Sequence, residues 1–335
     1  MTESMRDRLI RIIDKFPGRM LTVVGDLIAD EFLYAQISRV SREAPVLVLD
    51  HKELVSLPGG AANAANNLLD MACKVRVVGV VGKDAAGRSL FRALARKGAD
   101  TRHLGQERAY TTPVKTRILA GAHHSVSQQV VRIDRVPELD ANQNHPERSL
   151  RASLGPCDGI IFSDYGYGMA APSVLSHARQ VAKRKRIPLV VDSRFRMQEY
   201  TDVTAITPNI TELEAAVGRT IGANEILLRE VAARVIHKQR IRSLLVTQGR
   251  FGMTLFEKGS SPVRIPIFGS DEVADVTGAG DTVIAVFTLA LASGASAEEA
   301  ARLANYAGGL VVMKRGTATA TRSELRAAVE QDLSS

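Results

Sequence analysis

The stretch DVTGAGDTVIAVFTLALA, residues 275–292, joins a turn of small residues to the start of a long apolar helix. The backbone can approach an anion closely at three consecutive small residues, Gly278, Ala279 and Gly280. Their amides stand where the predicted helix begins, and the helix dipole favours negative charge at that end. The pattern therefore predicts a phosphate site that is positioned by a buried helix.

Asp281 closes this turn and is the candidate catalytic base. An aspartate with an ordinary pKa of about 3.9 is ionised at neutral pH and can take a proton from an attacking hydroxyl. The simpler interpretation is that Asp281 only favours the helix start and that the glycines only form a turn. Because the helix that follows is apolar on all faces, it is expected to be buried, and an acidic group at its start indicates a function.

Strand and helix signals alternate outward from this stretch through most of the chain. Apolar runs bounded by turn residues predict strands at 20–24, 75–81, 159–162, 189–191, 204–206 and 244–246. Helical periodicity predicts helices at 61–72, 85–97, 172–185, 211–217, 225–237, 282–292, 297–313 and 322–332. This order is typical of an α/β fold with a doubly wound, mostly parallel sheet flanked by helices.

Residues 31–57 and 112–136 depart from that order. Both regions contain extended segments with a partial period of two and no helix between them, which predicts a small separate β-sheet, here called the lid. No internal repeat or Ser/Gly linker is present, so we expect residues 1–335 to form a single domain that carries the lid. The open edges of the lid strands favour pairing into a homodimer.

The composition is that of a globular protein and limits the kinds of partner it can bind. In 335 residues, 45% are hydrophobic and 24% are charged, as in a globular protein. The net charge of +8 suits an anionic partner, while 4% aromatic residues and no Trp disfavour stacking on nucleic acid bases. The N-terminus has no apolar signal-peptide region, and the longest uncharged apolar run, of 16 residues, is too short to span a membrane. We expect a cytoplasmic protein in which Cys73 and Cys157 are buried free thiols rather than a disulfide or a metal site.

Several common signatures are absent from the sequence. It has no GxxxxGK[ST] loop, no GxGxxG after a strand, no GxSxG and no HExxH. The pair His123-His124 lies at a predicted hairpin tip and indicates a solvated turn rather than a metal site. The basic run at 183–186 ends a helix, where cations complement the dipole, and nucleic-acid binding is the alternative interpretation.

A second group of polar residues follows the first predicted strand. Asp30 is placed at the carboxyl end of that strand, where α/β sheets bind ligands, and a carboxylate can anchor the hydroxyls of a sugar. Gly59 and Gly60 allow close approach of the backbone, and Asn63 offers donors and an acceptor to a hydroxyl. Asp26 is either a ligand or a turn-forming residue.

Two further motifs lie at predicted strand ends. Asn209 and Glu212 fit a capping box at a helix start, or they support Mg²⁺ and phosphates through oxygen ligands and water. Thr247, Gly249 and Gly252 form a turn between two strands, which alone indicates a hairpin.

Together these motifs resemble those of the ribokinase-like (PfkB-type) sugar kinases, in the same order over nearly the whole chain. They are GDLIAD at 25–30, PGGAAN at 58–63, PNITE at 208–212, VTQGRFG at 246–252 and DVTGAGD at 275–281. The resemblance implies a doubly wound core with a β lid, ATP and Mg²⁺ as cosubstrates, and phosphorylation of a sugar hydroxyl.

The resemblance also implies roles for single residues. Asp281 is the catalytic base, residues 278–280 form the anion hole, and Asp30, Gly59, Gly60 and Asn63 bind the sugar. Asn209 and Glu212 support Mg²⁺ and phosphate, Glu212 indirectly, and the nucleotide is lined by Thr247, Gly249, Gly252 and Asn305. Asp275 and Thr277 resemble the ligands of a monovalent cation such as K⁺, and the segment at 316–319 matches that site loosely.

Within the family the likeness is closest to the heptose 7-phosphate kinases. It rests on SRVSREAPVLVL at 38–49, PGGAANAANNL at 58–68, VKTRIL at 114–119, QQVVRID at 128–134 and FSDYGYG at 162–168. It implies phosphorylation of the anomeric hydroxyl of D-glycero-β-D-manno-heptose 7-phosphate, a step toward ADP-heptose and the lipopolysaccharide core. The lid residues that reach toward the sugar phosphate are Lys115, Arg117, Gln128 and Arg132, or these form a basic, solvated hairpin.

The sequence departs from the family pattern in two places. DSRFR at 192–196 stands where the family often has DPKG, so a lysine role there passes to Arg194 or lapses. The lid insert at 120–127 is longer than usual. Many relatives carry a C-terminal nucleotidyltransferase domain, and we expect that this chain does not encode that second activity. The alternatives are a kinase for fructose, ribose or a hexose phosphate, and a non-catalytic nucleotide- or nucleic-acid-binding protein.

Overall fold

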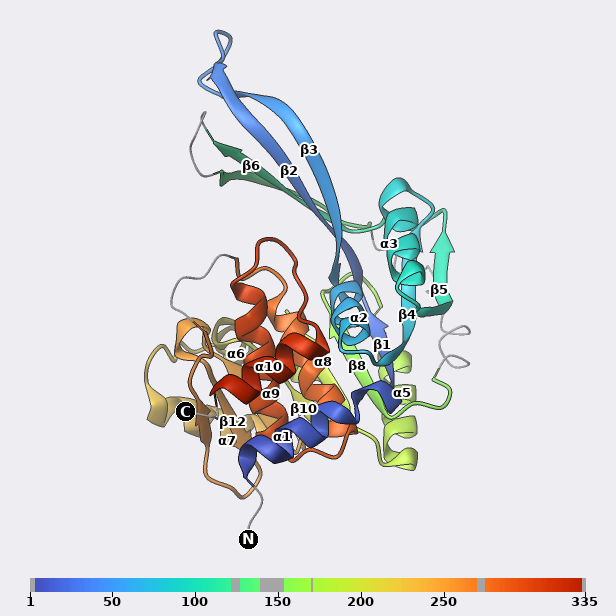
Figure 1. The fold of residues 1–335 in the computed structure, drawn as a ribbon, viewed down its shortest axis with the longest axis vertical. Coiled ribbons are helices and arrows are strands. Elements are labelled where there is room, and N and C mark those ends of the chain that lie inside the picture. Colours follow the sequence, from blue (N-terminus) through green and yellow to red (C-terminus); the bar gives the residue numbers. More distant parts are fainter. Residues whose placement is uncertain (1–3, 122–126, 139–153, 170, 270–274, 333–335) are drawn as a thin grey trace.

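The computed structural model describes residues 4–121, 127–138, 154–169, 171–269 and 275–332. A nine-stranded sheet with helices on both faces forms the body of the protein, and a four-stranded sheet, the lid, projects from it (Figure 1). The predicted fold class, a doubly wound α/β body with a β lid, is confirmed.

The body sheet has the strand order β13-β12-β11-β10-β9-β8-β1-β4-β5. Neighbours are parallel from β5 to β11, whereas β12 and β13 at one edge are antiparallel. The bounds are β1 Met20–Gly25, β4 Lys74–Gly82, β5 Asp100–Glu107, β8 Gly159–Asp164, β9 Leu189–Ser193, β10 Ala205–Ile206, β11 Ser243–Thr247, β12 Met253–Glu257 and β13 Val263–Ile265. The order reverses between β1 and β8, and ligands bind at the carboxyl ends of strands beside such a switch point.

The central strands bury both of their faces, which explains why they read as unbroken apolar runs. In β1, Val23 belongs to one hydrophobic cluster and Val24 to the other. In β8, Ile161 belongs to the same cluster as Val23, and Phe162 belongs to the same cluster as Val24. Alternate residues of one strand therefore supply two cores, one on each side of the sheet.

Two layers of helices cover the body sheet. One face carries α1 Met5–Asp14, α2 Ala61–Asp70, α3 Ala85–Arg96, α8 Ala279–Ala292, α9 Ala297–Val312 and α10 Arg322–Asp332. The other face carries α5 Pro172–Lys185, α6 Ile210–Val217 and α7 Glu225–Gln239. Helix α8 begins three residues before the predicted start at 282, because Gly278 takes a left-handed φ of 79° and ends the preceding turn.

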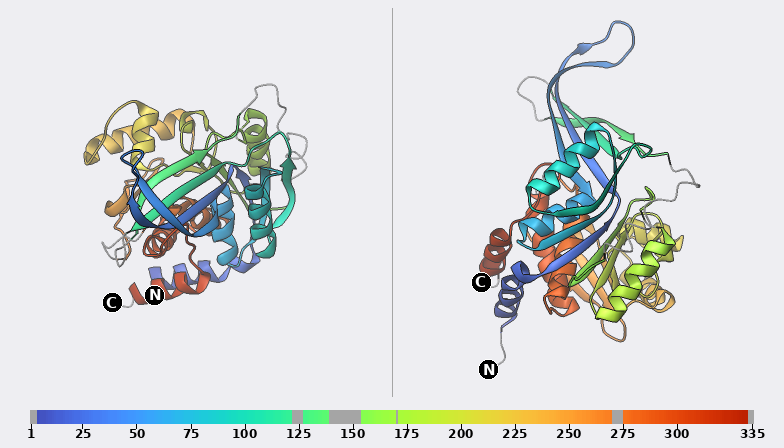
Figure 2. Two further views of the ribbon diagram at one scale, coloured as in Figure 1. Left: turned by 90° about the horizontal axis from the view of Figure 1, so that it is seen from above. Right: turned by 90° about the vertical axis from the view of Figure 1, so that its right-hand side faces the viewer.

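The lid consists of β2 Leu27–Val40, β3 Leu47–Gly60, β6 Val114–Gly121 and β7 Gln128–Arg135, in the order β3-β2-β6-β7. Two antiparallel hairpins, β2–β3 and β6–β7, are joined by a parallel pairing of β2 with β6. Strand β2 begins one residue after β1 ends, and β3 runs directly into α2, so the lid extends further into the body than the predicted segments (Figure 2). The single-domain organisation stays a prediction.

Three smaller predictions concern residues outside the candidate site. The basic residues Lys183 and Arg184 lie in the last turn of α5, as the dipole interpretation requires. Cys73 is buried, whereas Cys157 is only half-buried, and both are free thiols. His123-His124 lies outside the described residues. Within the described ranges, no helix has both the length and the apolar character needed to cross a bilayer.

Candidate active site

Asp281 lies in the first turn of α8, where the predicted phosphate site begins. Gly278 is needed at the preceding position, because a Cβ there would overlap the side-chain amide of Asn63 and the φ of 79° disfavours other residues. The amides of Gly280 and Asp281 belong to the first helical turn, whose N–H groups have no partner within the helix. The N–H of Ala279 already donates to the carbonyl of Val276 at 3.3 Å, so it is the least available of the predicted anion-hole amides.

The Asp281 carboxylate is 3% exposed and receives a hydrogen bond on each oxygen. The Asn63 amide Nδ2 donates to Oδ2 at 3.0 Å, and the Tyr165 hydroxyl donates to Oδ1 at 2.8 Å. Burial raises the pKa of Asp281 to about 7, although both hydrogen bonds and nearby Lys115 lower it. The expectation of an ordinary pKa is therefore wrong, because the sequence does not show how completely the helix start is buried.

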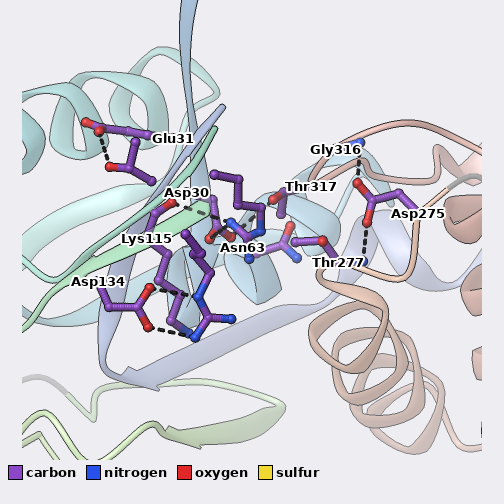
Figure 3. A network of polar contacts seen from close by, with 12 residues as sticks. Asp30, Glu31, Asn63, Lys115, Asp134, Asp275, Thr277, Gly316 and Thr317 are labelled. Atoms are coloured by element: carbon purple, nitrogen blue, oxygen red, sulfur yellow. Dashed lines mark hydrogen bonds and ion pairs between the residues drawn. The ribbon is translucent and has the colours of Figure 1, made fainter. Parts of the chain in front are cut away.

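Asp30 lies on β2 near the root of the lid and is bound from two sides (Figure 3). The Arg117 guanidinium forms an ion pair with it at 2.7 Å, and the Thr317 hydroxyl donates to it at 3.1 Å. Gly59 faces this carboxylate, and a Cβ at that position would overlap it. Gly60, with a φ of 56°, precedes α2, which carries Asn63 toward Asp281. The structure thus brings the predicted sugar residues close to the predicted base.

Asp26 has a structural role rather than that of a ligand. It is 0% exposed, and its carboxylate accepts hydrogen bonds from the backbone N–H groups of Tyr165, Tyr167 and Met169 at 2.8 to 3.0 Å. Burial raises its pKa against these three bonds. Because both oxygens are engaged inside the protein, the turn-forming interpretation is favoured for this residue.

Asn209 and Glu212 form the predicted capping box at the start of α6, with bonds of 2.8 and 2.9 Å. A bridge pairs Asn209 with Thr247, so the end of β11 and the start of α6 lie together. Burial raises the pKa of Glu212, and burial together with the Glu212 charge raises the pKa of Asp192, while Arg194 lowers both. The capping box does not exclude the second interpretation, in which Glu212 supports Mg²⁺ and phosphates, because Asp192 and Glu212 also form an acidic pair.

Two of the other predicted nucleotide residues, Gly252 and Asn305, meet on one backbone segment. Gly252, with a φ of 80°, packs so closely against Ile265 that a Cβ would overlap its carbonyl. Asn305 on α9 donates to the carbonyl of Pro266 at 2.8 Å. Gly249 has a φ of 57° and faces open space. Two motifs separated by about 50 residues therefore meet at residues 265–267, the segment that follows β13.

Asp275 links the start of the motif to the segment at 316–319 (Figure 3). Its two oxygens accept hydrogen bonds from the N–H groups of Thr277 at 2.9 Å and Gly316 at 3.1 Å. The next residue of that segment, Thr317, reaches Asp30. The loosely matching segment therefore lies beside the candidate cation ligands and also touches the candidate sugar site.

The four lid residues predicted to reach the sugar phosphate differ in how close they lie to Asp30 and Asp281. Lys115 is buried, and its Nζ lies 4.7 Å from the centre of the Tyr165 ring, close to Asp281, while Arg117 holds Asp30. Arg132 lies opposite Arg117 in the β6–β7 pairing and binds Asp134 at 2.8 Å. Gln128 pairs with Ala120, about 17 Å along the strand from Lys115, so the structure does not bring it to the site.

Tyr165 and Thr317 are functional candidates to which the sequence assigns no role, although they lie within the segments 162–168 and 316–319. Tyr165 directly follows β8, as Asp26 directly follows β1, and both positions lie at the carboxyl ends of neighbouring strands. The rule that selected Asp30 could have selected Tyr165 as well. Thr317 carries no such signal, because its contact with Asp30 joins residues 287 positions apart.

The reversed strand order, the β lid and the buried acidic helix start define a ribokinase-like fold. The chain matches the family described as pfkB family carbohydrate kinase over residues 19–324, and it belongs to that family. The family named from the motifs is therefore confirmed. Similar proteins include the bifunctional protein HldE of Trichlorobacter lovleyi, 40% identical over 92% of this chain, and that of Geobacter sulfurreducens, 39% identical over 90%.

The chain covers 62% and 61% of the lengths of these two relatives. Among solved structures, Arabidopsis thaliana ribokinase complexed with ribose and ATP has a TM-score of 0.71 and 22% identity, covering 93% of this chain and 99% of that one. Escherichia coli phosphofructokinase-2 in complex with potassium has a TM-score of 0.72 and 19% identity, covering 95% and 99%. At these identities the likeness establishes the fold.

Proposed function

We propose that the protein is an ATP-dependent sugar kinase whose acceptor is the anomeric hydroxyl of D-glycero-β-D-manno-heptose 7-phosphate. The product is the 1,7-bisphosphate, which belongs to ADP-heptose and lipopolysaccharide core biosynthesis, a cytoplasmic process. The observation that carries the kinase assignment is a buried carboxylate, Asp281, at the start of a helix whose first amides face outward along its axis. Family membership supports it.

In this mechanism the protein positions the reactants and stabilises charge. Asp30 and Asn63 orient the sugar, and ionised Asp281 takes the proton of the attacking hydroxyl. The amides of the α8 start stabilise negative charge on the transferring phosphoryl group. The pKa of about 7 at Asp281 leaves a useful fraction ionised at neutral pH and makes the carboxylate a stronger proton acceptor than an exposed aspartate.

The carboxylate oxygens near the predicted nucleotide residues are suitable ligands for Mg²⁺. Asp192 and Glu212 form an acidic pair, and hard oxygen ligands of this kind suit Mg²⁺, which keeps several waters and binds phosphates. Within the described residues, no three His, Cys, Asp or Glu side chains lie close enough to hold an ion alone, which agrees with a site completed by ATP. When bound, Mg²⁺ neutralises charge on the phosphates. Asp275 and Thr277 are the proposed ligands of K⁺.

The phosphate of the acceptor would bind on one face of the lid. The pairing of β2, β6 and β7 places Asp30, Lys115, Arg117 and Arg132 on the same face. Two guanidinium groups directly opposite each other repel unless an anion lies between or beside them, and here each holds a carboxylate. A sugar phosphate can replace one of these carboxylates and bridge the cations.

The opposite face of the lid supports the proposed homodimer. Leu54, Val131 and Ile133 all lie on the face turned away from Asp30, according to the strand register, and they are 50%, 50% and 56% exposed. Exposed apolar patches of this kind mark contact surfaces. Pairing of two lids would cover these side chains and the free strand edges.

A panel of acceptors with coupled detection of ADP tests the proposal. Heptose 7-phosphate should give the highest kcat/KM. Fructose and ribose should be used at least about 100-fold less well, as expected for a site built to pair with a phosphate dianion, and fructose 6-phosphate, which carries that dianion, tests whether the site also selects the sugar. Preference for an unphosphorylated sugar would support the alternative acceptors. Salt-sensitive DNA binding without sugar-dependent ADP release would support the non-catalytic alternative.

A further inference from the structure

A side chain to which the motifs assign no role contacts the proposed base directly. Tyr165 follows the last residue of β8, and its hydroxyl donates to Oδ1 of Asp281 at 2.8 Å. The Asn63 amide donates to the other oxygen at 3.0 Å. Burial and the Asp281 charge raise the pKa of Tyr165 well above its ordinary value, so the hydroxyl keeps its proton and stays a donor.

Asp26 fixes the segments that carry both of these donors. Its carboxylate binds the N–H groups of Tyr165, Tyr167 and Met169, which sets the path of the chain just after β8. Its main-chain carbonyl accepts the N–H of Ala61 at 3.0 Å, the first residue of the helix that carries Asn63. One buried residue therefore holds two separate segments whose side chains meet at the same carboxylate.

We propose that Tyr165 is a positioning residue for Asp281: it fixes the plane of the carboxylate and stabilises its charged form, and Asp26 holds Tyr165 in place. The proposal rests on the assignment of Asp281 as the base. A carboxylate oxygen has two lone pairs, so the bond from Tyr165 leaves Oδ1 able to accept the proton of the sugar hydroxyl.

The charged groups around Asp281 determine the expected pH dependence. Asp30 on β2 raises its pKa, Lys115 on β6 lowers it, and the Asp281 charge in turn raises the pKa of Asp192 on β9. Removing the Tyr165 hydroxyl deletes one interaction that favours the ionised form. The pKa of Asp281 should therefore rise, and the fraction able to accept a proton at pH 7 should fall.

Tyr165→Phe removes the hydroxyl and keeps the ring over which the Lys115 ammonium lies. The acid limb of kcat/KM should move upward by about one pH unit, and activity at pH 7 should fall about fivefold, because the ionised fraction drops from about one half to about one eleventh. At pH 9 the loss should be smaller, because Asp281 is then ionised in both proteins. Tyr167→Phe is the matched control: its N–H is also held by Asp26, and it should leave the acid limb unchanged.

Titration of ¹³C-carboxyl-labelled aspartate by NMR tests the same contact without turnover, with the Asp281 signal assigned from Asp281→Asn. The pKa of Asp281 should be higher in Tyr165→Phe than in the wild type and in Tyr167→Phe. Equal values in all three proteins would overturn the inference. Failure of every acceptor in the kinase assay would instead contradict the proposed function, while the titration still decides whether Tyr165 acts on Asp281.

Discussion

Asp281 combines two properties that oppose each other at the level of a single residue. Its burial makes it a good proton acceptor, but burial also makes the charged form costly inside the folded protein. The sequence identifies the residue from its position before an apolar helix. It does not give the pKa, because that depends first on how completely the carboxylate is buried and then on hydrogen bonds from Asn63 and Tyr165, which lie 218 and 116 positions away.

Replacement of the proposed base should abolish turnover and spare binding. Asp281→Asn removes the proton acceptor, so kcat should fall by roughly 10³-fold or more, while ATP binding measured by calorimetry stays within about threefold of the wild type. Asp7→Asn, at an exposed carboxylate on α1, is the control and should be fully active. An Asp281→Asn protein with near-normal kcat would remove Asp281 from the mechanism.

The same substitution should stabilise the protein at alkaline pH. The folded-state pKa of about 7 lies above the unfolded value, so the free energy of unfolding falls as pH rises from about 4 through 7. The shift corresponds to roughly 4 kcal/mol as an upper bound. The asparagine side chain carries no charge at any pH, and the Tyr165 hydroxyl can turn to accept a hydrogen bond from its amide.

Thermal unfolding of both proteins at pH 5 and pH 8 measures this effect. Asp281→Asn should have the higher Tm at pH 8, and the difference should shrink at pH 5, where the wild-type carboxyl is protonated. A difference that is independent of pH would show that the charge of Asp281 is not the cause.

At the level of elements, burial decided which strands could be predicted. The central strands β1, β4, β8, β9 and β11 are covered on both faces and read as apolar runs. Strand β5 lies at the edge of the sheet with the mixed sequence DTRHLGQE, and β12 and β13 form the opposite edge. Strands β5 and β13 are not predicted from the sequence, because edge strands lack a continuous apolar pattern, whereas β12 is the strand predicted after the turn at Gly252.

The start of α8 depends on Gly278, so a substitution of this glycine tests how the helix start positions the site. Gly278→Ala places a Cβ against the Asn63 amide and forces a φ of 79° on a residue that disfavours it. Since Asn63 would be displaced from Asp281, kcat should fall about 100-fold in the coupled assay. Circular dichroism should show the helical content unchanged.

Gly218→Ala is the matched control for this substitution. Gly218 ends α6 with a φ of 66°, and a Cβ there meets open space. It therefore carries the backbone strain of about 1 kcal/mol without the clash, and kcat should stay at the wild-type value. Equal losses of kcat in the two variants would contradict the proposed contact between Gly278 and Asn63.

At the level of the whole molecule, the sequence predicts the two parts of the fold but not which side chains meet between them. The order of the motifs identifies the family and the lid. The pairing of Arg117 with Asp30 and of Thr317 with the same carboxylate depends on the register of β2 with β6 and on the path of residues 316–317. Such contacts between distant segments leave no pattern in a single sequence.

The lid surface gives a prediction about assembly. Ile133→Asp places a charge on the apolar face turned away from Asp30, so it should convert a dimer into a monomer in light scattering coupled to size-exclusion chromatography. Ile226→Asp is the control, because Ile226 is 75% exposed on α7, an element of the body. A wild-type protein that is monomeric at micromolar concentration would refute the lid dimer.

The root of the lid has a mechanical consequence. Strand β2 continues β1 after one residue, and β3 passes into α2 without a loop, so neither strand has a flexible joint at its base. Irregular pairing occurs further out, at Tyr34/Ala35 and at Ile37/Arg39. If the lid flexes, it bends at these points, which lie beyond Asp30, and only its outer half moves. The groups proposed to hold the sugar ring would then keep their places whether the lid is raised or lowered, so alignment of the acceptor would be independent of lid movement.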